Sequence, residues 1–404
     1  ENAPKSHCGL DEGNPYTTVD VAPVVVEKPY IVMTDGGKYS LMVPRVEFNK
    51  RGPTPNYDNA DEIPFENVFV AADDICPDNC LAKTINEKLA AGLDVVLQPG
   101  IYHLEDSIIV NNANTVLLGL GLATLMAPPD KPCVKVGDVD GVKVSGLLLQ
   151  ATAKEHMAPA LLQFGSAKGY AGNAAAPGAV HDVFARVGAD EHIEVAAETM
   201  FQINSGNVIV DDTWLWRGDH TIDGIIHNSK NHVRTGFEVN GDDVIAYGLA
   251  VEHTLGHLVE WNGDNGRTYF YQSELPYDVD RDYADNGYTG YKVADNVQKH
   301  EAWGIGVYSN FIDHLVETPT GIKVPKKAGI NFHNSLTVKL ASNGGIKHVI
   351  NDQGDEVNDT NTAVAYVCEY NGAQHVSEML KAEVFPSDDS NLFTAVSLGF
   401  WGFG

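Results

Sequence analysis

The feature that most constrains the fold is a tandem pair of apolar strands within residues 241–278. The stretches VIAYGLAVEH (244–253) and TYFYQSELPY (268–277) begin 24 residues apart, and each follows a turn of Asn, Asp and Gly. A repeat of about 20–30 residues, built from short strands and Asn/Gly corners without helical spacing, is typical of a β-solenoid. Equivalent strands of successive coils then lie about 4.8 Å apart. We therefore expect the polar residues at the ends of these two strands to share one patch.

Further coils are found by aligning the corners of the repeat. Strands that start at Val142, Val208 and Val244 align with a strand that starts at Tyr269 or Thr268. The alignment gives two neighbouring columns of residues: Gln150, Trp216, Glu252 and Pro276 in one, and Ala151, Arg217, His253 and Tyr277 in the other. The first two separations are longer, 66 and 36 residues, so insertions are expected, with a long excursion in residues 152–204.

The rest of the chain divides around this series of coils. Leu81, Ile85 and Leu89 have helical spacing, which predicts a cap helix over residues 80–94. We expect three regions: an extended N-terminal arm and hairpin over 1–64, a parallel β-helix over 65–362, and a C-terminal capping segment over 363–404. Within the arm, the hairpin is predicted at 31–43 and a proline-containing loop at 47–64.

The stretch from 94 to 128, with LQPGIYHL followed by LLGLGLATL, resembles the entry coil of pectate-lyase-like proteins. The resemblance implies an all-β fold, a single-stranded right-handed parallel β-helix with an N-terminal cap helix. Residues 14–352 also resemble a largely uncharacterised family of secreted microbial proteins, and more distantly the paired β-helix exo-β-1,3-glucanases. The matching stretches include NPYTTVDVAPVVVEKPY, DGVKVSGLLL, NGRTYFYQSELPYD and GYKVADNVQKHEAWGIG.

These resemblances imply a secreted, extracellular protein that acts on a polysaccharide or oligosaccharide, without fixing the sugar. In the resembling proteins another β-helical segment precedes NPYTTV, whereas here that motif begins at residue 14. A separate chain that supplies an upstream β-helical half is therefore one expected partner.

Composition excludes two classes of partner. The chain has 27 Lys and Arg against 55 Asp and Glu, so its net charge is −28. Such a field repels nucleic acid and anionic membrane surfaces. No apolar run approaches the ~20 residues needed to cross a bilayer. We expect neither nucleic acid nor membrane as a partner, and no required cofactor.

Five cysteines give an odd count, so at least one is unpaired within the chain. Cys76 and Cys80 are close enough in sequence to close a small loop. In an oxidising environment we expect them to be bonded to each other, or to Cys8 and Cys133.

The polar ends of the aligned strands suggest a sugar site. Aromatic faces stack on the C–H groups of sugars, and carboxylates act at the anomeric carbon. Glu252 and Glu274 are the paired candidates, and their separation of 22 residues keeps both on one face of the sheet. Asp278 is a further catalytic candidate, with Glu301 as a substitute. The substrate-binding candidates are Trp216, Arg217, Asp219, His220, His253, Tyr277, Glu301 and Trp303. The alternative is a polar ladder along a solvated face.

The acidic loop that follows offers a metal-binding alternative. Asp278, Asp280 and Asp282 have the alternate spacing that begins a calcium loop. Tyr283 and Thr289 stand where an EF-hand needs Gly and Glu, so it is not an EF-hand. A Ca²⁺ site of another geometry and a solvated loop both stay open.

We interpret the chain as a glycoside hydrolase that uses two carboxylates. Two alternatives remain. A polysaccharide lyase would use Arg217 to neutralise a uronate and His253 as the base. A non-catalytic structural or adhesive protein of a cell wall would need only a stiff, acidic solenoid.

Overall fold

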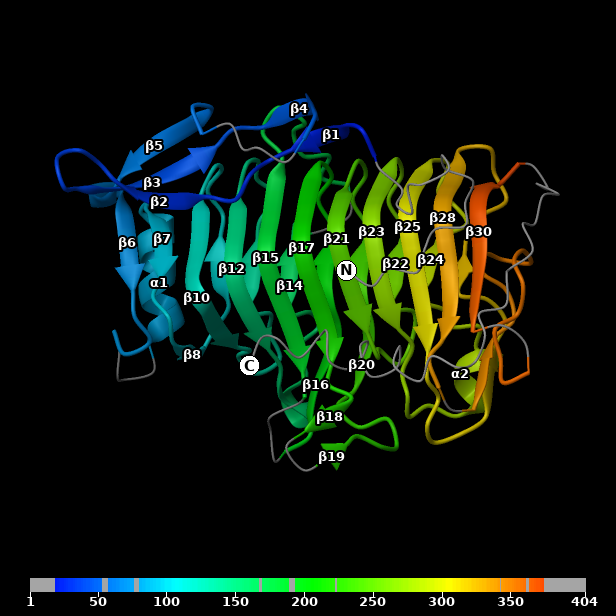
Figure 1. The fold of residues 1–404 in the computed structure, drawn as a ribbon. Helices are drawn as coiled ribbons and strands as arrows, with labels where there is room; N and C mark the ends of the chain where they lie inside the picture. Colours follow the sequence, from blue (N-terminus) through cyan, green and yellow to red (C-terminus); the bar gives the residue numbers. More distant parts are fainter. Residues whose placement is uncertain are drawn as a thin grey trace.

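The chain folds into two long, mainly parallel sheets that face each other, the second behind the larger one in Figure 1. The structure, a computed structural model, describes residues 19–52, 57–75, 80–166, 169–188, 193–221, 224–341, 343–360 and 363–373. Within these ranges there are two α-helices, α1 (Leu81–Ala90) and α2 (Arg281–Asp285). This confirms an all-β protein with parallel sheets.

The larger sheet has 12 strands, and its neighbouring strands are parallel except for β28 and β30. Its members are β6 (Val68–Ala71), β7 (Asp94–Leu97), β8 (Ile101–His103), β10 (Val116–Met126), β12 (Lys143–Gln150), β15 (Gly178–Val187), β17 (Val208–Arg217), β21 (Ile245–Glu252), β23 (Gly266–Glu274), β25 (His300–Ser309), β28 (Ile330–Lys339) and β30 (Val364–Asn371).

The second sheet has nine strands, parallel except where β13 pairs with β16. Its members are β9 (Ile108–Val110), β11 (Val134–Val136), β13 (Thr152–Ala153), β14 (Leu162–Phe164), β16 (Val195–Ile203), β20 (Val233–Val239), β22 (Val259–Trp261), β24 (Tyr291–Val293) and β27 (Ile322–Lys323). Two smaller pairs are β18 (His220–Thr221) with β19 (Gly224–Ile225), and β26 (Val316–Thr318) with β29 (Gly344–Ile346). From β9 to β24 the chain alternates between the two large sheets, so each passage through both is one coil.

The interior between the sheets is apolar because the strands alternate inward and outward side chains. In β21 and the residue before it, Val244 and Ala246 point inward, and then Leu249 and Val251 do so. The three-residue step arises because Gly248 has a left-handed backbone, with φ of 59°. The same left-handed position recurs in neighbouring strands, at Asp212, Phe270 and Gly304 among others. Side chains that follow this bend, including those at the strand ends, therefore point to the same face of the sheet on neighbouring strands.

An antiparallel N-terminal arm lies across the outer face of the larger sheet (Figure 1). It contains β1 (Ala22–Val25), β2 (Tyr30–Met33), β3 (Tyr39–Pro44), β4 (Glu47–Lys50) and β5 (Ala60–Pro64). The hairpin expected at 31–43 is formed by β2 and β3. The loop expected at 47–64 is wrong in part, because β4 pairs with β1 and β5 pairs with β3. Pro64 is the last residue of β5, at a strand end where proline is tolerated.

The helix predicted over 80–94 forms as α1, which buries Leu81, Ile85 and Leu89 and packs beside β7 and β9. At the other end of the larger sheet, β30 adds an antiparallel strand. Residues 374–404, most of the expected capping segment, lie outside the described residues. Across the described ranges, no helix is long and apolar enough to cross a membrane.

The cysteines divide into two kinds. Cys80 and Cys368 each take part in a disulfide bond. Cys133 is a buried free thiol, so the suggestion that it joins a disulfide is wrong. Burial between the sheets gives Cys133 the role of a small apolar side chain. Cys8 and Cys76 lie outside the described residues.

The register corrects two details of the sequence alignment. The 66-residue separation between Val142 and Val208 contains a whole coil, because β15 lies between β12 and β17 in the sheet. Residues 152–204 are therefore not one long excursion. On β23, Arg267 pairs with Ile245, so this strand starts earlier than expected and Glu274, rather than Pro276, faces Glu252.

Candidate active site

Two glutamates lie side by side at the ends of adjacent strands. Glu252 is the last residue of β21 and Glu274 the last of β23, and the two are register partners. On the other side Trp216, near the end of β17, is the register partner of Glu252. All three strands run in one direction, so these residues lie together at the arrowhead ends in Figure 1. Neighbouring strands are about 4.8 Å apart, which brings the two carboxyl groups within strong electrostatic interaction.

Glu252 is the buried member of the pair, with 6% of its surface exposed. Its Oε2 accepts a hydrogen bond from Trp214 Nε1 at 2.8 Å. Burial, and after it the negative charge of Glu274, raise the pKa of Glu252 to about 8. Hydrogen bonds from Trp214 and Gln272 act in the opposite direction. The pair therefore holds one proton at neutral pH, and that proton belongs to the pair rather than to either carboxyl.

Glu274 is more accessible, with 18% of its side chain exposed. It accepts a hydrogen bond from the Tyr277 hydroxyl. The Nε2 atom of His253 is 4.0 Å from Glu274 Oε2 and 3.9 Å from Asp219 Oδ1. Burial lowers the pKa of His253, so the ring is favoured as a neutral group between two carboxylates. Figure 1 places the segment that carries Asp219 at the same lower edge of the sheet, beside β18.

Aromatic rings stand beside the carboxylates. The rings of Trp214 and Trp216 are stacked, with centroids 5.3 Å apart and planes 25° apart. Trp216 also contacts His220, at 5.4 Å between centroids, and His220 Nδ1 is 3.0 Å from Asp219 Oδ1. This gives the site a wall of ring faces and edges, which is the type of surface that packs on sugar rings.

Arg217 and Asp278 form a buried ion pair and do not face the site. The guanidinium group is 1% exposed and donates two hydrogen bonds to Asp278, at 2.9 and 2.8 Å. It also donates to the backbone carbonyls of Lys230, Asn231 and His253. Arg217 follows the outward-facing Trp216, so strand alternation turns it inward. Both residues thus fix the loop after β17, and neither is placed to touch substrate.

The acidic loop does not form a metal centre. Asp278 is engaged by Arg217, and Asp280 caps α2 by accepting a hydrogen bond from the Asp282 amide. Nowhere in the described ranges do three His, Cys, Asp or Glu side chains gather so that they could hold a metal ion. In the described loop Asp278, Asp280 and Asp282 thus do not gather as a set of metal ligands.

Glu301 and Trp303 lie towards the opposite end of β25. The register partner of Glu274 is Tyr308, whereas Glu301 pairs with Arg267. Trp303 is stacked between Tyr269 and His333, with centroid distances of 4.6 and 5.1 Å. Trp303 thus belongs to a ladder of stacked rings with Tyr269 and His333, Glu301 lies beside that ladder, and neither residue joins the carboxylate pair.

Two residues of the site were missed from the sequence, Trp214 and Gln272. Trp214 donates to Glu252 and stacks on Trp216, and Gln272 hydrogen-bonds Glu252 from the strand of Glu274. Each stands two positions before a candidate on the same strand. The strand period of two therefore placed them on the same face, and this signal was available in the sequence.

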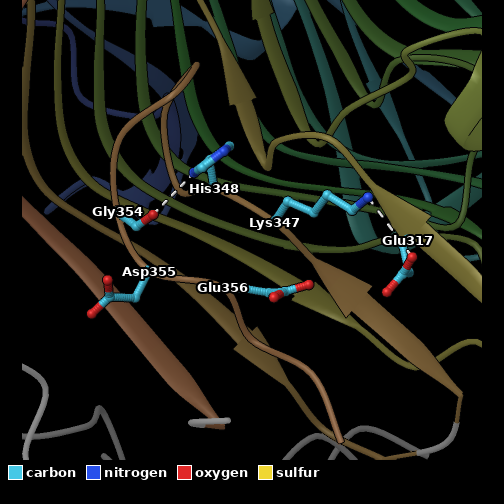
Figure 2. Close-up of a pocket in the computed structure, with 6 residues that line it drawn as sticks. All are labelled: Glu317, Lys347, His348, Gly354, Asp355 and Glu356. Carbon is cyan, nitrogen blue, oxygen red and sulfur yellow. Dashed lines mark hydrogen bonds and ion pairs between the residues drawn. The ribbon is translucent and has the colours of Figure 1, made fainter. Parts of the chain in front are cut away.

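A polar pocket of about 470 Å³ lies elsewhere, near β26 and β29 (Figure 2). Its lining residues are Glu317, Lys347, His348, Gly354, Asp355 and Glu356. Lys347 pairs with Glu317 at 3.8 Å, and His348 Nδ1 is 3.1 Å from the Gly354 carbonyl oxygen. This pocket contains no aromatic platform and no residue of the carboxylate pair.

The chemistry that the strand ends offer is acid–base chemistry at two coupled carboxyls beside aromatic rings. One proton shared by two carboxyls gives a donor and a base in one site. Sugar hydrolysis at an anomeric carbon requires this combination.

The chain is similar to known proteins over most of its length. Residues 75–274 match the LAM55 pectate lyase-like domain. The chain is 38% identical over 367 residues to an exo-beta-1,3-glucanase of Streptomyces sp. SirexAA-E, covering 88% of this chain and 58% of that protein.

Solved structures give the same relationship. The structure of sacteLam55A from that organism has a TM-score of 0.78 and 37% identity, over 88% of this chain and 64% of that one. A variant of the same protein, solved in complex with glucose, matches equally well. The chain thus spans about three fifths of the length of these relatives, to which it is homologous.

Proposed function

We propose that this chain carries the catalytic half of a glycoside hydrolase that acts on β-1,3-linked glucan. The observation that carries the proposal is the register pairing of Glu252 with Glu274 beside the stacked tryptophans. Homology to an exo-β-1,3-glucanase supports both the reaction class and the glucan.

In the proposed mechanism the pair divides the work of donor and base. Glu274 is the donor, because this more exposed carboxyl is the one that a sugar can reach. Glu274 donates the proton to the glycosidic oxygen as the bond to the anomeric carbon breaks. Glu252 is then the carboxylate that acts at the anomeric carbon, either as the nucleophile or as the base for the attacking water. Trp214 stabilises the ionised form of Glu252 through its indole N–H.

A polysaccharide lyase is disfavoured by the burial of its required cation. Neutralising a uronate needs an exposed positive group, whereas the Arg217 side chain is 1% exposed and its guanidinium group is paired with the Asp278 carboxylate. His253, the expected base, has its pKa lowered by burial and faces Asp219 and Glu274. This arrangement favours a neutral sugar over an acidic one.

The finer features of the fold and the location are part of the same proposal. We infer that the coils wind as one right-handed parallel β-helix with α1 as its cap, because parallel crossovers are almost always right-handed. We also infer that the protein is secreted. The disulfides at Cys80 and Cys368 support an oxidising compartment.

The decisive experiment compares E252Q and E274Q with wild type on two substrates. On an unactivated β-1,3-glucan, E274Q should lose about 10²- to 10⁴-fold in kcat. On a dinitrophenyl β-glucoside, whose leaving group needs no proton, E274Q should retain far more activity than E252Q. Proton NMR of the first-formed anomer then distinguishes inversion from retention. Equal activity of wild type and both variants on the glucan would refute the proposal.

A further inference from the structure

An exposed phenylalanine in an unfavourable backbone conformation stands on the same strand as Glu274. Phe270 lies in the middle of β23, is 62% exposed, and has a φ of 65°. A bulky residue in the left-handed region is strained, because its Cβ crowds the following carbonyl. Such outliers are concentrated at functional sites, where the strain is tolerated for a purpose.

The neighbouring coils show what the bend itself requires. The same left-handed position is occupied by Gly248 on β21 and by Gly304 on β25. The bend is therefore satisfied by glycine on both sides, and a phenyl ring is not needed to form it. Because both residues level with Phe270 on the adjacent strands are glycines, no large side chain from that position stands beside its ring.

Phe270 is also aligned with the carboxylate pair. It precedes Glu274 by four residues on one strand, a distance of at most about 13 Å. Gln272, midway between them, hydrogen-bonds Glu252. The flanking register partners of Gln272 are Ala250 and Gly306, so the surface on either side of this line carries small residues.

We propose that Phe270 is a stacking platform for a sugar ring of the glucan chain beyond the bond that is cleaved. The inference rests on the proposed function and adds a remote subsite to it. A neutral pyranose presents a C–H face that packs on an exposed aromatic ring. A glucan that enters along β23, from Phe270 towards Glu274, would contact the platform only when it is longer than the shortest substrates.

The chain supplies a matched control at the same kind of bend. Leu122 on β10 is 49% exposed and also left-handed, with a φ of 54°. β10 is separated from β21 in the sheet by β12, β15 and β17. Replacing Leu122 by Gly or Ala changes strain and exposed apolar surface as the change at Phe270 does, but at a distance from the carboxylates.

The test measures kcat/KM of wild type, F270A, F270G, L122A and L122G on β-1,3-gluco-oligosaccharides from the disaccharide upward. We expect F270A and F270G to lose about two- to tenfold on the long oligosaccharides and nothing on the disaccharide. Both Leu122 variants should match wild type at every length. F270G should melt no lower than wild type, since glycine relieves the strain. This excludes misfolding as the cause of the loss.

Electrophoresis of E274Q, with and without F270A, through gels that contain β-1,3-glucan gives a readout without turnover. Weaker retardation of the double variant supports the platform. Equal retardation, or an equal kcat/KM of F270A and L122A at every length, overturns it while leaving the hydrolase intact. A wild type that neither cleaves nor binds the glucan overturns the proposed function instead.

Discussion

Replacing Glu252 with Gln should stabilise the protein relative to wild type as the pH rises from about 5 to 8. Burial and the adjacent Glu274 raise the pKa of Glu252 from 4.5 to about 8. Between these values the folded protein keeps a proton that the unfolded chain has released. The folded state thus binds more protons, and the free energy of unfolding of wild type falls as the pH rises.

The magnitude follows from the width of this pH window. Each pH unit within the window lowers the free energy of unfolding of wild type by about 1.4 kcal/mol. The loss over the whole window is therefore at most roughly 5 kcal/mol. An unfolding entropy of about 2.1 cal/mol/K per residue gives a chain of this length roughly 0.8 kcal/mol/K. The loss therefore corresponds to a Tm difference of at most about 6 °C, which E252Q should gain over wild type between low and high pH.

The assay is thermal unfolding by circular dichroism at several pH values and one scan rate. E87Q is the control, because Glu87 is an exposed carboxylate on α1, remote in sequence from the pair. The Tm difference between E252Q and wild type should grow with pH, while that between E87Q and wild type should stay constant. A constant difference for E252Q would refute the raised pKa and, with it, the shared proton on which the mechanism depends.

Three further outcomes follow from contacts around the site. D278N leaves the buried Arg217 guanidinium uncompensated, so the free energy of unfolding should fall by about 3–5 kcal/mol and the Tm by several degrees; a Tm within one degree of wild type would contradict the pairing. W214F removes a hydrogen bond that lowers the pKa of Glu252, so the alkaline limb of the pH–rate profile should move up by about one unit, and no movement would exclude that contact. Cys133 should resist alkylation in the folded protein and react only after denaturation, as mass spectrometry of labelled peptides will report.

The sequence was sufficient to predict the sheets and the common face of the two glutamates, because both depend on a period of two. Val208 and Val244 start aligned strands, and the even separation of Glu252 and Glu274 keeps them on one face. The omission of the β15 coil from the sequence alignment has a different cause. β15 contains Val180, Val183 and Val187, but it begins within the Gly- and Ala-rich residues 171–179, which lack the β-branched residues that indicate a strand and so hide its start.

The two-residue error on β23 has its origin in the bend. Where the left-handed residue is glycine, as at Gly248 and Gly304, the sequence gives a sign that the alternation will shift. On β23 this position is Phe270, which reads as an ordinary strand residue. The shift was therefore invisible, and the strand was aligned by its first apolar residues rather than by Gly266.

The role of Arg217 could not be predicted, because its partner lies 61 residues further along the chain. A charged residue beside Trp216 has two physical solutions, an exposed position at the site or a buried one with its charge compensated. Strand alternation favours burial of the Arg217 side chain, but a buried guanidinium group is stable only when a carboxylate lies within hydrogen-bonding distance. That carboxylate, Asp278, follows β23, two coils further along the chain. No pattern in the sequence around Arg217 indicates that the two residues pair.

The site lies where a short connection from the larger sheet to the second sheet stands between two long ones. After β21 the chain needs only residues 253–258 to reach β22, whereas residues 218–232 follow β17 and residues 275–290 follow β23. The two long connections belong to neighbouring coils, and each brings side chains towards the pair: Asp219 from one and Tyr277 from the other. His253, from the short connection, is in reach of both, 3.9 Å from Asp219 and 4.4 Å between ring centroids from Tyr277. A longer middle connection would place its own backbone between them. The convergence of acid, base and orienting groups thus depends on a difference in loop length, which a solenoid can vary coil by coil without disturbing the register of its sheets.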